Sequence, residues 1–527
     1  MAGGRSAIVL ALAALLVGGA VLSGCTAPAA AAAPEPEAAA PAAPAAGRRD
    51  EAQRFREANR LTWGADSSAI ALLRTLGYQR YVDRQLHPSS ARLPPAVQAQ
   101  IDALTISRRP MIAIAREMAE QRRQAVALTD DDAKKAALKQ WQQDMTRLGR
   151  EAQTREILRA LYSPNQVQEQ MTWFWMNHFN VFLYKGNIRA TIGDYADVVR
   201  AHALGRFRDL LGAVAHHPAM LVYLDNVQNA AGHVNENYAR EIMELHTMGV
   251  GSGYTQQDVQ QLARIMTGVG VSFQPSDPRL PPRLGAYFVR DGAFEFNPRR
   301  HDFGPKVFLG EAIHGHGLAE FDEALDRLAR APATAHFISR QLAVYWLSDN
   351  PSPALVERMA QTYLGSDGDI AATLHTLFTA PEFMQAAGAK FKDPMRYVIS
   401  SVRLAYDGRT ILNAQPIINW LARMGEPLYG HQTPDGYPAT EADWASPGQM
   451  ETRFEVARAI GSGSAGLFRS DGPQPVERPA FPQMANALYY DAFGRTLGPA
   501  TRKALEQAAS PQEWNTLLLS SPEFMRR

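Results

Sequence analysis

The sequence predicts a mainly α-helical protein, a large multi-helix globular body with one small β insertion. From about residue 50 onwards, apolar residues recur at three- and four-residue spacing, as they do on one face of an α-helix. Helix-start signals precede such segments, and Ser163 in "SPNQ" and Thr255 in "YTQQD" are the predicted caps. Residues 285–313 instead alternate aromatic with polar residues between Gly and Pro, which predicts a small β-hairpin and loop.

The composition is that of a folded protein without a charge bias. Of 527 residues, 46% are hydrophobic and 20% are charged, so the chain can bury a large core. Residues 1–25 contain Arg5 and no acid, and without them 53 basic residues stand against 53 acidic ones. A balanced charge gives no long-range attraction to polyanions, so we expect no nucleic acid partner. The single cysteine, Cys25, excludes a disulfide framework, a zinc knuckle or a cysteine nucleophile in the body.

The N-terminus has the layout of an export signal that ends at Cys25. Arg5 precedes an apolar run over 7–22, as in a secretory signal peptide. The "LSGC" that ends at Cys25 resembles the lipobox of bacterial lipoproteins, which implies a signal peptide over 1–24 and a lipid anchor on the thiol. Thr26 follows instead of Asp, which in Gram-negative lipoproteins implies the outer membrane, with the body facing the periplasm. An ordinary cleaved signal, or an anchor helix with an incidental cysteine, is the alternative.

The rest of the chain divides into three further segments. Residues 25–50 form an Ala/Pro tract that cannot bury a core and is expected to be a disordered tether. Residues 51–390 are the predicted helical body with the candidate polar site, and 391–527 are a C-terminal helical region packed on it. No segment after the signal has the roughly 18 apolar residues that a membrane span needs. The long turn-rich loop 425–450 is of a kind that is often functional or packed over a site.

Several motifs together resemble one bacterial family, domain of unknown function 1800. They are "RLTWGA" (60–65), "WFWMNHFNV" (173–181), "HPAMLVYLDN" (217–226), "NENYAREIMELHTMGV" (235–250), "YTQQDVQQLARIMTG" (254–268), "HDFGPKVFLG" (301–310), "SDGDI" (366–370) and "TPDGYPATEADW" (433–444). The resemblance covers about residues 59–525. It implies a mainly helical, exported protein and, from the genes that often accompany the family, a partner protein of a second exported family. It implies no particular activity.

The most polar motif is "NENYAREIMELHTMGV", and its phasing on an ideal helix separates its side chains. Glu236, Arg240 and Glu244 follow one another at four-residue steps, while Asn237 and Glu241 form the adjacent row. One interpretation is an exposed ion-pair ladder. The other is a carboxylate site for a metal or for acid–base chemistry, because carboxylates three residues apart, as Glu241 and Glu244 are, can serve one ion.

Histidines near this motif have two interpretations each. His246 lies two residues after Glu244 and therefore off the carboxylate face unless the helix unwinds, so we expect it to contact another element or to cap the helix end. His178, in "WFWMNHF", falls on an aromatic stripe, which fits either a core histidine or a ligand. Asn177 beside it could hold a histidine tautomer or a ligand.

The motif "RRHDFGPK" places candidate residues on the predicted β/loop insertion. His301 could act as a base or a ligand there, since loops between rigid elements often carry function. Asp302 is adjacent to His301 and is expected to serve a different partner. Lys306 could contact an anion. A structural role is the alternative for each.

Two functional hypotheses follow. The first is a cell-envelope enzyme, a metal-assisted hydrolase built where the 235–246, 171–182 and 299–306 segments meet. Its candidate catalytic residues are Glu241, Glu244, His301, Asp302 and Lys306; its candidate ligands for a divalent metal are His178, Glu241, Glu244 and His301; and its supporting residues are Asn177, Asn237, Arg240 and His246. The second is a non-catalytic envelope module that binds a partner protein or glycan, with the polar cluster holding the helices in register. Convergence of the four metal ligands would favour the first.

Overall fold

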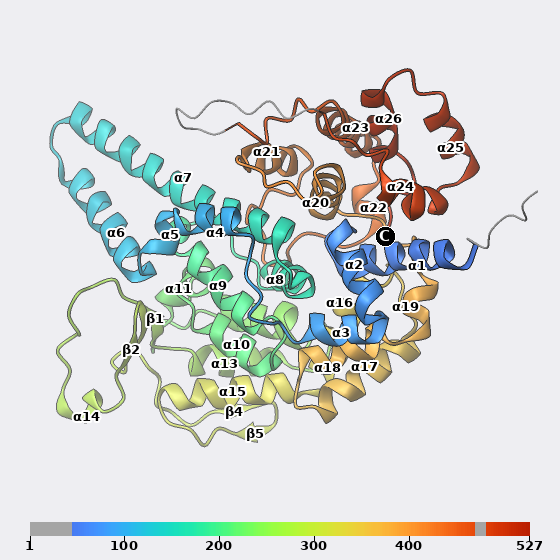
Figure 1. Ribbon diagram of the computed structural model, residues 1–527. Coiled ribbons are helices and arrows are strands. Elements are labelled where there is room, and N and C mark those ends of the chain that lie inside the picture. Colours follow the sequence, from blue (N-terminus) through green and yellow to red (C-terminus); the bar gives the residue numbers. More distant parts are fainter. Residues whose placement is uncertain (1–44, 470–480) are drawn as a thin grey trace, which may run out of the picture. The chain divides into compact units, whose positions relative to one another are not determined.

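The computed structural model describes residues 45–469 and 481–527, which belong to one compact unit, Ala45–Arg527. The predicted signal peptide, Cys25 and nearly all of the predicted tether lie outside the described residues. The described body is mainly helical with small antiparallel sheets, as the sequence predicts (Figure 1). None of its helices is both long and apolar enough to cross a membrane.

The first part of the body is a continuous series of helices. They are α1 (Ala45–Leu61), α2 (Ser67–Leu76), α3 (Tyr78–Leu86), α4 (Pro95–Asp102), α5 (Thr105–Arg108), α6 (Met111–Ala127), α7 (Asp131–Tyr162), α8 (Gln166–His178), η1 (Ile188–Ala190), α9 (Ile192–His202), α10 (Phe207–Ala215), α11 (Pro218–Tyr223), η2 (Asn226–Gln228), α12 (Asn237–Glu241), η3 (Ile242–Thr247) and α13 (Gln256–Ile265). Thr255 caps α13 in a capping box with Asp258, as expected. The predicted cap Ser163 instead ends α7, because α8 begins only at Gln166, after Asn165.

The second part returns to helices after the small sheets. They are α14 (Pro282–Gly285), α15 (Leu318–Arg330), α16 (Pro332–Trp346), α17 (Pro353–Gly365), α18 (Ile370–Phe378), α19 (Pro381–Gln385), α20 (Pro394–Ala405), α21 (Gln415–Arg423), α22 (Glu441–Trp444), α23 (Pro447–Gly461), α24 (Ala487–Asp491), η4 (Phe493–Thr496), α25 (Pro499–Glu506) and α26 (Pro511–Leu519). Helix α20 contacts α7, α21 and α23, and η4 contacts α1. The C-terminal helices therefore join the same core as the N-terminal ones.

Helices α6 and α7 form a hairpin that extends beyond the neighbouring helices (Figure 1). Asp130 caps α7 by accepting a hydrogen bond from the Ala133 amide at 2.7 Å. The hairpin has a small core of its own, separate from the main one, that includes Met118 of α6 and Trp141 and Met145 of α7.

The predicted β insertion forms two small antiparallel sheets. Strand β3 (Phe294–Phe296) pairs with β2 (Val289–Asp291) on one side and with β1 (Val269–Val271) on the other. Strands β4 (Val307–Phe308) and β5 (Glu311–Ala312) form the second sheet. Strand β1 lies before residues 285–313 and was not predicted. A three-residue strand is too short to show an alternation of apolar and polar residues.

The polar motif of residues 235–250 does not form one ideal α-helix. After α12, the element η3 is a π-helix, with the Thr247 hydroxyl donating to the Ile242 carbonyl at 2.7 Å and the Met248 amide donating to the Met243 carbonyl at 3.0 Å. A π turn inserts one extra residue per turn and often marks a functional position. It shifts the phase of every residue after Glu241.

Candidate functional site

The row Glu236, Arg240 and Glu244 is an ion-pair ladder on the surface. Arg240 contacts Glu236 at 3.2 Å and Glu244 at 3.3 Å, and all three side chains are partly exposed. Arg240 also donates to Gln256 at the start of α13, at 2.7 Å. These groups tie α12 to α13. Asn237, in the next row, donates to the Leu224 carbonyl at 3.1 Å and is likewise structural.

Glu241 stands apart from this ladder. Within the described residues its carboxylate makes neither an ion pair nor a side-chain hydrogen bond. Partial burial raises its pKa, and the nearby carboxylates Glu244 and Asp435 raise it further against the opposing effect of Arg240. Glu241 therefore faces the loop that carries Asp435, more than 190 residues further along the chain.

The π turn brings His246 into the core beside His178. His178 Nε2 donates to the His246 carbonyl at 3.0 Å, and the two ring centroids lie 6.1 Å apart. Phe174, Trp175 and Phe179 pack around His178, as its aromatic stripe predicts. Burial lowers the pKa of His178 to about 4 and that of His246 well below the usual range. Both rings are therefore neutral at pH 7.

His301 and Lys306 belong to a separate buried network on the β/loop insertion. His301 contacts the Thr267 carbonyl through Nδ1 at 2.8 Å and Glu320 through Nε2 at 3.2 Å, and Lys306 lies 2.6 Å from the other Glu320 oxygen. Burial would raise the pKa of Glu320, but the hydrogen bonds from His301 and Lys306 lower it. The sequence suggests Lys306 as an anion contact, and the anionic group that it contacts in this structure is Glu320.

Asp302 serves a different partner from its neighbour, as expected. Its Oδ2 accepts from Arg264 Nε at 2.8 Å, and its Oδ1 accepts from the Gly304 amide at 2.8 Å. These bonds lower the pKa of Asp302 and shape the turn after His301. Asp302 and Arg264 fasten the loop to α13.

The four predicted metal ligands are not brought together. His178 lies among aromatic rings against η3, Glu241 faces the loop of Asp435, and His301 lies with Glu320. Across residues 45–469 and 481–527, no three His, Cys, Asp or Glu side chains are arranged to hold a metal ion. The predicted ligands are separated because aromatic rings surround His178, Arg240 pairs with Glu244, and Glu320 contacts His301.

A cavity of about 410 Å³ instead joins His178 to residues from the C-terminal third of the chain. Its walls are formed by the end of α8, by α16 and by the loop that follows α21. The lining residues are Trp173, Phe174, Asn177, His178, Gln341, Tyr345, Asp393, Glu426, His431, Thr433, Asp435, Gly436, Tyr437, Pro438 and Ala439. We refer to it as the acid–base cavity. It combines four aromatic side chains with three carboxylates and two histidines, a composition typical of a binding site.

Asn177 holds the long loop against α8. Its side-chain amide donates to the Tyr437 carbonyl at 2.9 Å, and its oxygen accepts from the Tyr437 amide at 2.6 Å. Asn180 donates to the carbonyls of His431 and Thr433 at 3.1 and 2.8 Å. Asn177 is therefore a residue that positions this loop, neither a metal ligand nor a partner of the His178 ring.

Gly436 is required where this loop meets α8. Its φ is +72°, and a Cβ at this position would lie 2.3 Å from the Asn177 carbonyl oxygen. No other residue type permits both the left-handed backbone and this close approach. The glycine thus sets the distance between the loop and His178.

Glu426 is the most perturbed acid of the cavity. It is 3% exposed, and its Oε2 accepts from the Met395 amide at the start of α20 at 2.7 Å. Burial and the neighbouring Asp393 raise the pKa of Glu426 well above its usual range. Asp393 itself caps α20 by accepting from the Arg396 amide at 2.7 Å. Glu426 therefore keeps its proton to a higher pH than an ordinary glutamate does.

Asp435 has the opposite electrostatic environment in the same cavity. Burial would raise its pKa, but hydrogen bonds from Thr433 at 2.6 Å and from His431 at 3.2 Å lower it. The Thr433 hydroxyl also lies 3.0 Å from His431 Nε2. Asp435 therefore loses its proton more readily than an ordinary aspartate does, and Glu426 loses its proton less readily than an ordinary glutamate does.

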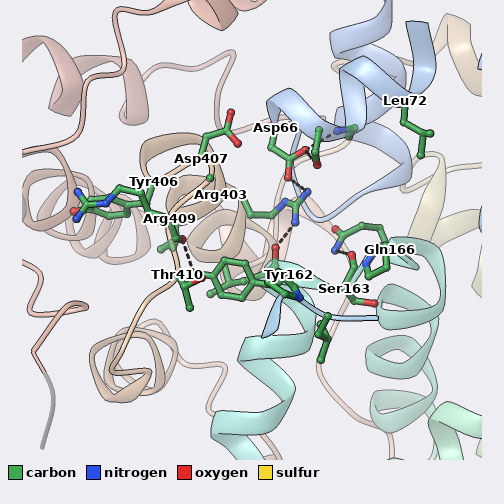
Figure 2. Close-up of a pocket in the computed structure, with 18 of the residues that line it drawn as sticks. Asp66, Leu72, Tyr162, Ser163, Gln166, Arg403, Tyr406, Asp407, Arg409 and Thr410 are labelled. Atoms are coloured by element: carbon green, nitrogen blue, oxygen red, sulfur yellow. Dashed lines mark hydrogen bonds and ion pairs between the residues drawn. The ribbon is translucent and has the colours of Figure 1, made fainter. Parts of the chain in front are cut away.

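A larger cavity of about 610 Å³ lies between α2, the end of α7 and α20 (Figure 2). Asp66 and Arg403 point towards each other in it and form an ion pair. Arg403 also donates to the carbonyls of Gly64, at 2.9 Å, and Leu161, and Asp66 caps α2. The central charges of this larger cavity thus pair with each other and form hydrogen bonds with the backbone.

Comparison with known proteins adds the family. The model of the family described as protein of unknown function (DUF1800) matches residues 56–526. The chain belongs to this family. No curated protein and no solved structure matches the chain significantly.

In this DUF1800 member, sequence reasoning missed the acids that define the cavity. Glu426 and Asp393 lie at the ends of loops with no local pattern, and only folding brings them together. The one signal was the loop 425–450, noted as long and turn-rich, which contains the family motif "TPDGYPATEADW". Asn177 and His178 were found because they lie in an unusual polar pair within an aromatic helix.

Proposed function

We propose that this DUF1800 protein is a lipid-anchored protein of the bacterial cell envelope that performs acid–base hydrolysis on a glycan. The observation that carries the chemistry is the pair of acids with opposite pKa shifts in one cavity, raised for Glu426 and lowered for Asp435. Environments that separate the pKa values of two acids in this way assign the general acid and the base. The lipobox-like "LSGC" and the Ala/Pro tract support an anchored body on the periplasmic side of the outer membrane.

Glycoside hydrolysis is the reaction class that fits this pair. It requires one protonated carboxyl group to protonate the leaving oxygen and one carboxylate to act as base or nucleophile. Glu426 fits the first role, and Asp435, oriented by His431 and Thr433, fits the second. His178 adds a neutral hydrogen-bond acceptor, since its Nε2 is occupied by the His246 carbonyl. The aromatic walls suit the apolar faces of sugar rings.

A metal-assisted version of this hydrolase lacks its ligand set in the described residues, because the predicted ligands do not converge. Glu244 instead belongs to the surface ladder with Arg240, and Glu241 lies near Asp435.

The second candidate is a binding module without catalysis, for a glycan or for a partner protein of a second exported family. The observation that favours it is that the ladder, Asn177 and the His301–Glu320–Lys306 network all hold elements together. Such networks can specify a structure without chemistry.

The deciding experiment compares wild type with Glu426→Gln and Asp435→Asn on fragments of envelope glycans. Reducing-end release measures hydrolysis, and quenching of tryptophan fluorescence measures binding through Trp173. For an acid–base hydrolase, each variant loses about a hundredfold or more in rate while binding persists. Glu455→Gln, an exposed ion-paired glutamate on α23, is the matched control and keeps full activity. If wild type binds the fragments without hydrolysing them, the second candidate, a binding module, is established instead. If wild type neither binds nor hydrolyses them, the proposal is refuted.

A further inference from the structure

Five basic side chains lie buried close together where the end of the chain meets α1. They are Arg60, Lys392, Arg396, Arg453 and Arg527, each at most 3% exposed. Arg396 and Arg527 both stack on the rings of Tyr345 and Trp346, and Arg60 donates to the Trp346 carbonyl at 3.0 Å. Arg453 donates to the Lys392 carbonyl at 2.8 Å. We refer to these five residues as the buried basic cluster.

The acidic side chains facing the buried basic cluster do not neutralise it. Asp393 and Glu426 are the acids whose charges act on it. Glu426 Oε2 already accepts from the Met395 amide, and Asp393 Oδ1 accepts from the Arg396 amide in capping α20. Even if both acids are ionised, two negative charges face five basic side chains. Buried cations thus outnumber buried anions in this part of the core, an arrangement that is costly unless each charge finds a partner.

Several polar atoms of the buried basic cluster lack hydrogen-bond partners in the described structure. They are Nε of Arg60, Arg396 and Arg453, and both Nε and Nη1 of Arg527. Lys392 Nζ has a single hydrogen-bond partner there, the Ser400 hydroxyl at 3.0 Å, and lies 3.8 Å over the ring of Phe524. Aromatic faces offset part of the cost of a buried cation, but an unmade hydrogen bond to a charged group still costs about 1–3 kcal/mol or more.

A cavity of about 520 Å³ opens onto this cluster. Lys392, Arg527 and Phe524 line it, and the more exposed Arg56 and Arg526 line it too. Glu523 is the single acidic side chain among its described lining residues. Both Glu523 oxygens are occupied, one by the Gly498 amide and one by the Thr501 hydroxyl, at 2.7 Å each. The acidic side chain of the cavity is therefore not free to pair with the cationic side chains that line it.

We propose that this cavity binds a small anion of the phosphate or carboxylate class, held by Lys392 and Arg527. Anionic oxygens supply the acceptors that these donors lack, and hydrogen bonds between charged groups are the strong ones. Arg56 and Arg526 at the rim would attract the anion. The site is distinct from the acid–base cavity, and its existence does not depend on the proposed hydrolysis.

Isothermal titration of the full chain with inorganic phosphate, citrate and glycerol 3-phosphate tests this proposal. We expect wild type to bind at least one of these anions. Lys392→Met, which keeps the length of the side chain, is expected to weaken binding by about tenfold or more. Arg423→Gln, on the exposed face of α21, is the matched control and binds like wild type. Tighter binding of glycerol 3-phosphate would identify a lipid headgroup as the source, and equal or weaker binding a free anion.

Arg526→Gln guards against a folding defect in the Lys392 variant. Its side chain is 35% exposed and pairs with Glu441 outside the core, so it leaves the buried basic cluster in place. It is expected to weaken binding by a few fold, as removal of one rim charge does. Absence of binding by wild type, or binding of equal strength by both the Lys392 and the Arg526 variants, would overturn the proposal.

Discussion

His178 donates a hydrogen bond from Nε2 to the backbone carbonyl of His246, 3.0 Å away, and so connects α8 to the π turn η3. The bond fixes the tautomer of His178 and leaves its lone pair on Nδ1. Because burial lowers the pKa of this ring to about 4, His178 offers the acid–base cavity a neutral acceptor at pH 7. The π turn thus contributes to the cavity through a backbone oxygen, while the ring of His246 stays in the core.

Replacing Gly436 with alanine should displace the loop that carries Asp435. The new Cβ would lie 2.3 Å from the Asn177 carbonyl oxygen and would also be strained at φ +72°. We expect a loss of about 2–4 kcal/mol in the free energy of unfolding and loss of ligand binding, measured by urea unfolding and tryptophan fluorescence. Gly310→Ala is the control, because its φ is +82° but no atom lies within 4 Å. Equal losses in both variants would mean that the contact with Asn177 is unimportant.

Replacing Glu320 with glutamine should destabilise the β insertion, because it leaves Lys306 buried without a carboxylate. We expect a cost of about 3–5 kcal/mol in urea unfolding. Since the pKa of Glu320 is lowered from 4.5, the wild-type advantage should be complete above that pH and should disappear as the pH falls below it. Glu236→Gln in the exposed ladder should cost less than about 1 kcal/mol. A cost as small for Glu320 would contradict the assignment of a buried ion pair.

Replacing Glu156 with glutamine should change how stability depends on pH. Burial raises the pKa of Glu156 to about 7, and Glu169 adds to this effect. The folded protein then holds this proton more tightly than the unfolded chain, so wild-type stability falls as pH rises from 4.5 through about 7. The variant should gain up to about 3 kcal/mol over wild type between pH 4.5 and 8.

Urea unfolding of both proteins at several pH values would measure this difference. Glu117→Gln, an exposed glutamate of α6, is the control and should show no such gain. A stability difference that is constant with pH would show that Glu156 is ionised in the folded protein.

Replacing Cys25 with alanine should abolish lipid attachment. In the bacterial host, wild type is expected to incorporate radiolabelled palmitate and to fractionate with the outer membrane, because a thiol in a lipobox-like sequence accepts the acyl-bearing group. The variant should incorporate none. Label in the variant, or its absence from wild type, would contradict the anchor and favour an ordinary signal peptide.

Much of the architecture was predictable because it depends on local signals. Helical periodicity, the Thr255 cap and the β-rich insertion are properties of short segments, and the last two appear as predicted at Thr255 and Phe294–Phe296. The ion pairs of Glu236, Arg240 and Glu244 were predictable from their four-residue spacing alone. Glu244 lies early in the π turn, so the turn does not disrupt this spacing.

The candidate site was less predictable because it depends on contacts distant in sequence. Glu426 owes its raised pKa to Asp393 and to burial, neither of which has a sequence signature. Glu320 could not be foreseen as the partner of His301, because it is one acid among many on an amphipathic helix. The direction of the His246 side chain depends on the π turn, and no pattern in "REIMELHTM" predicts that turn.

The hairpin of α6 and α7 has a consequence for work in living cells. Met118, Trp141 and Met145 belong to a small hydrophobic core that is separate from the main one. The tip of the hairpin therefore adds nothing to the main core, and it lines neither proposed site. The short turn after Ala127 is therefore a natural insertion point for an epitope or a fluorescent tag. A protein labelled there could be followed in cells with its main core and both proposed sites undisturbed.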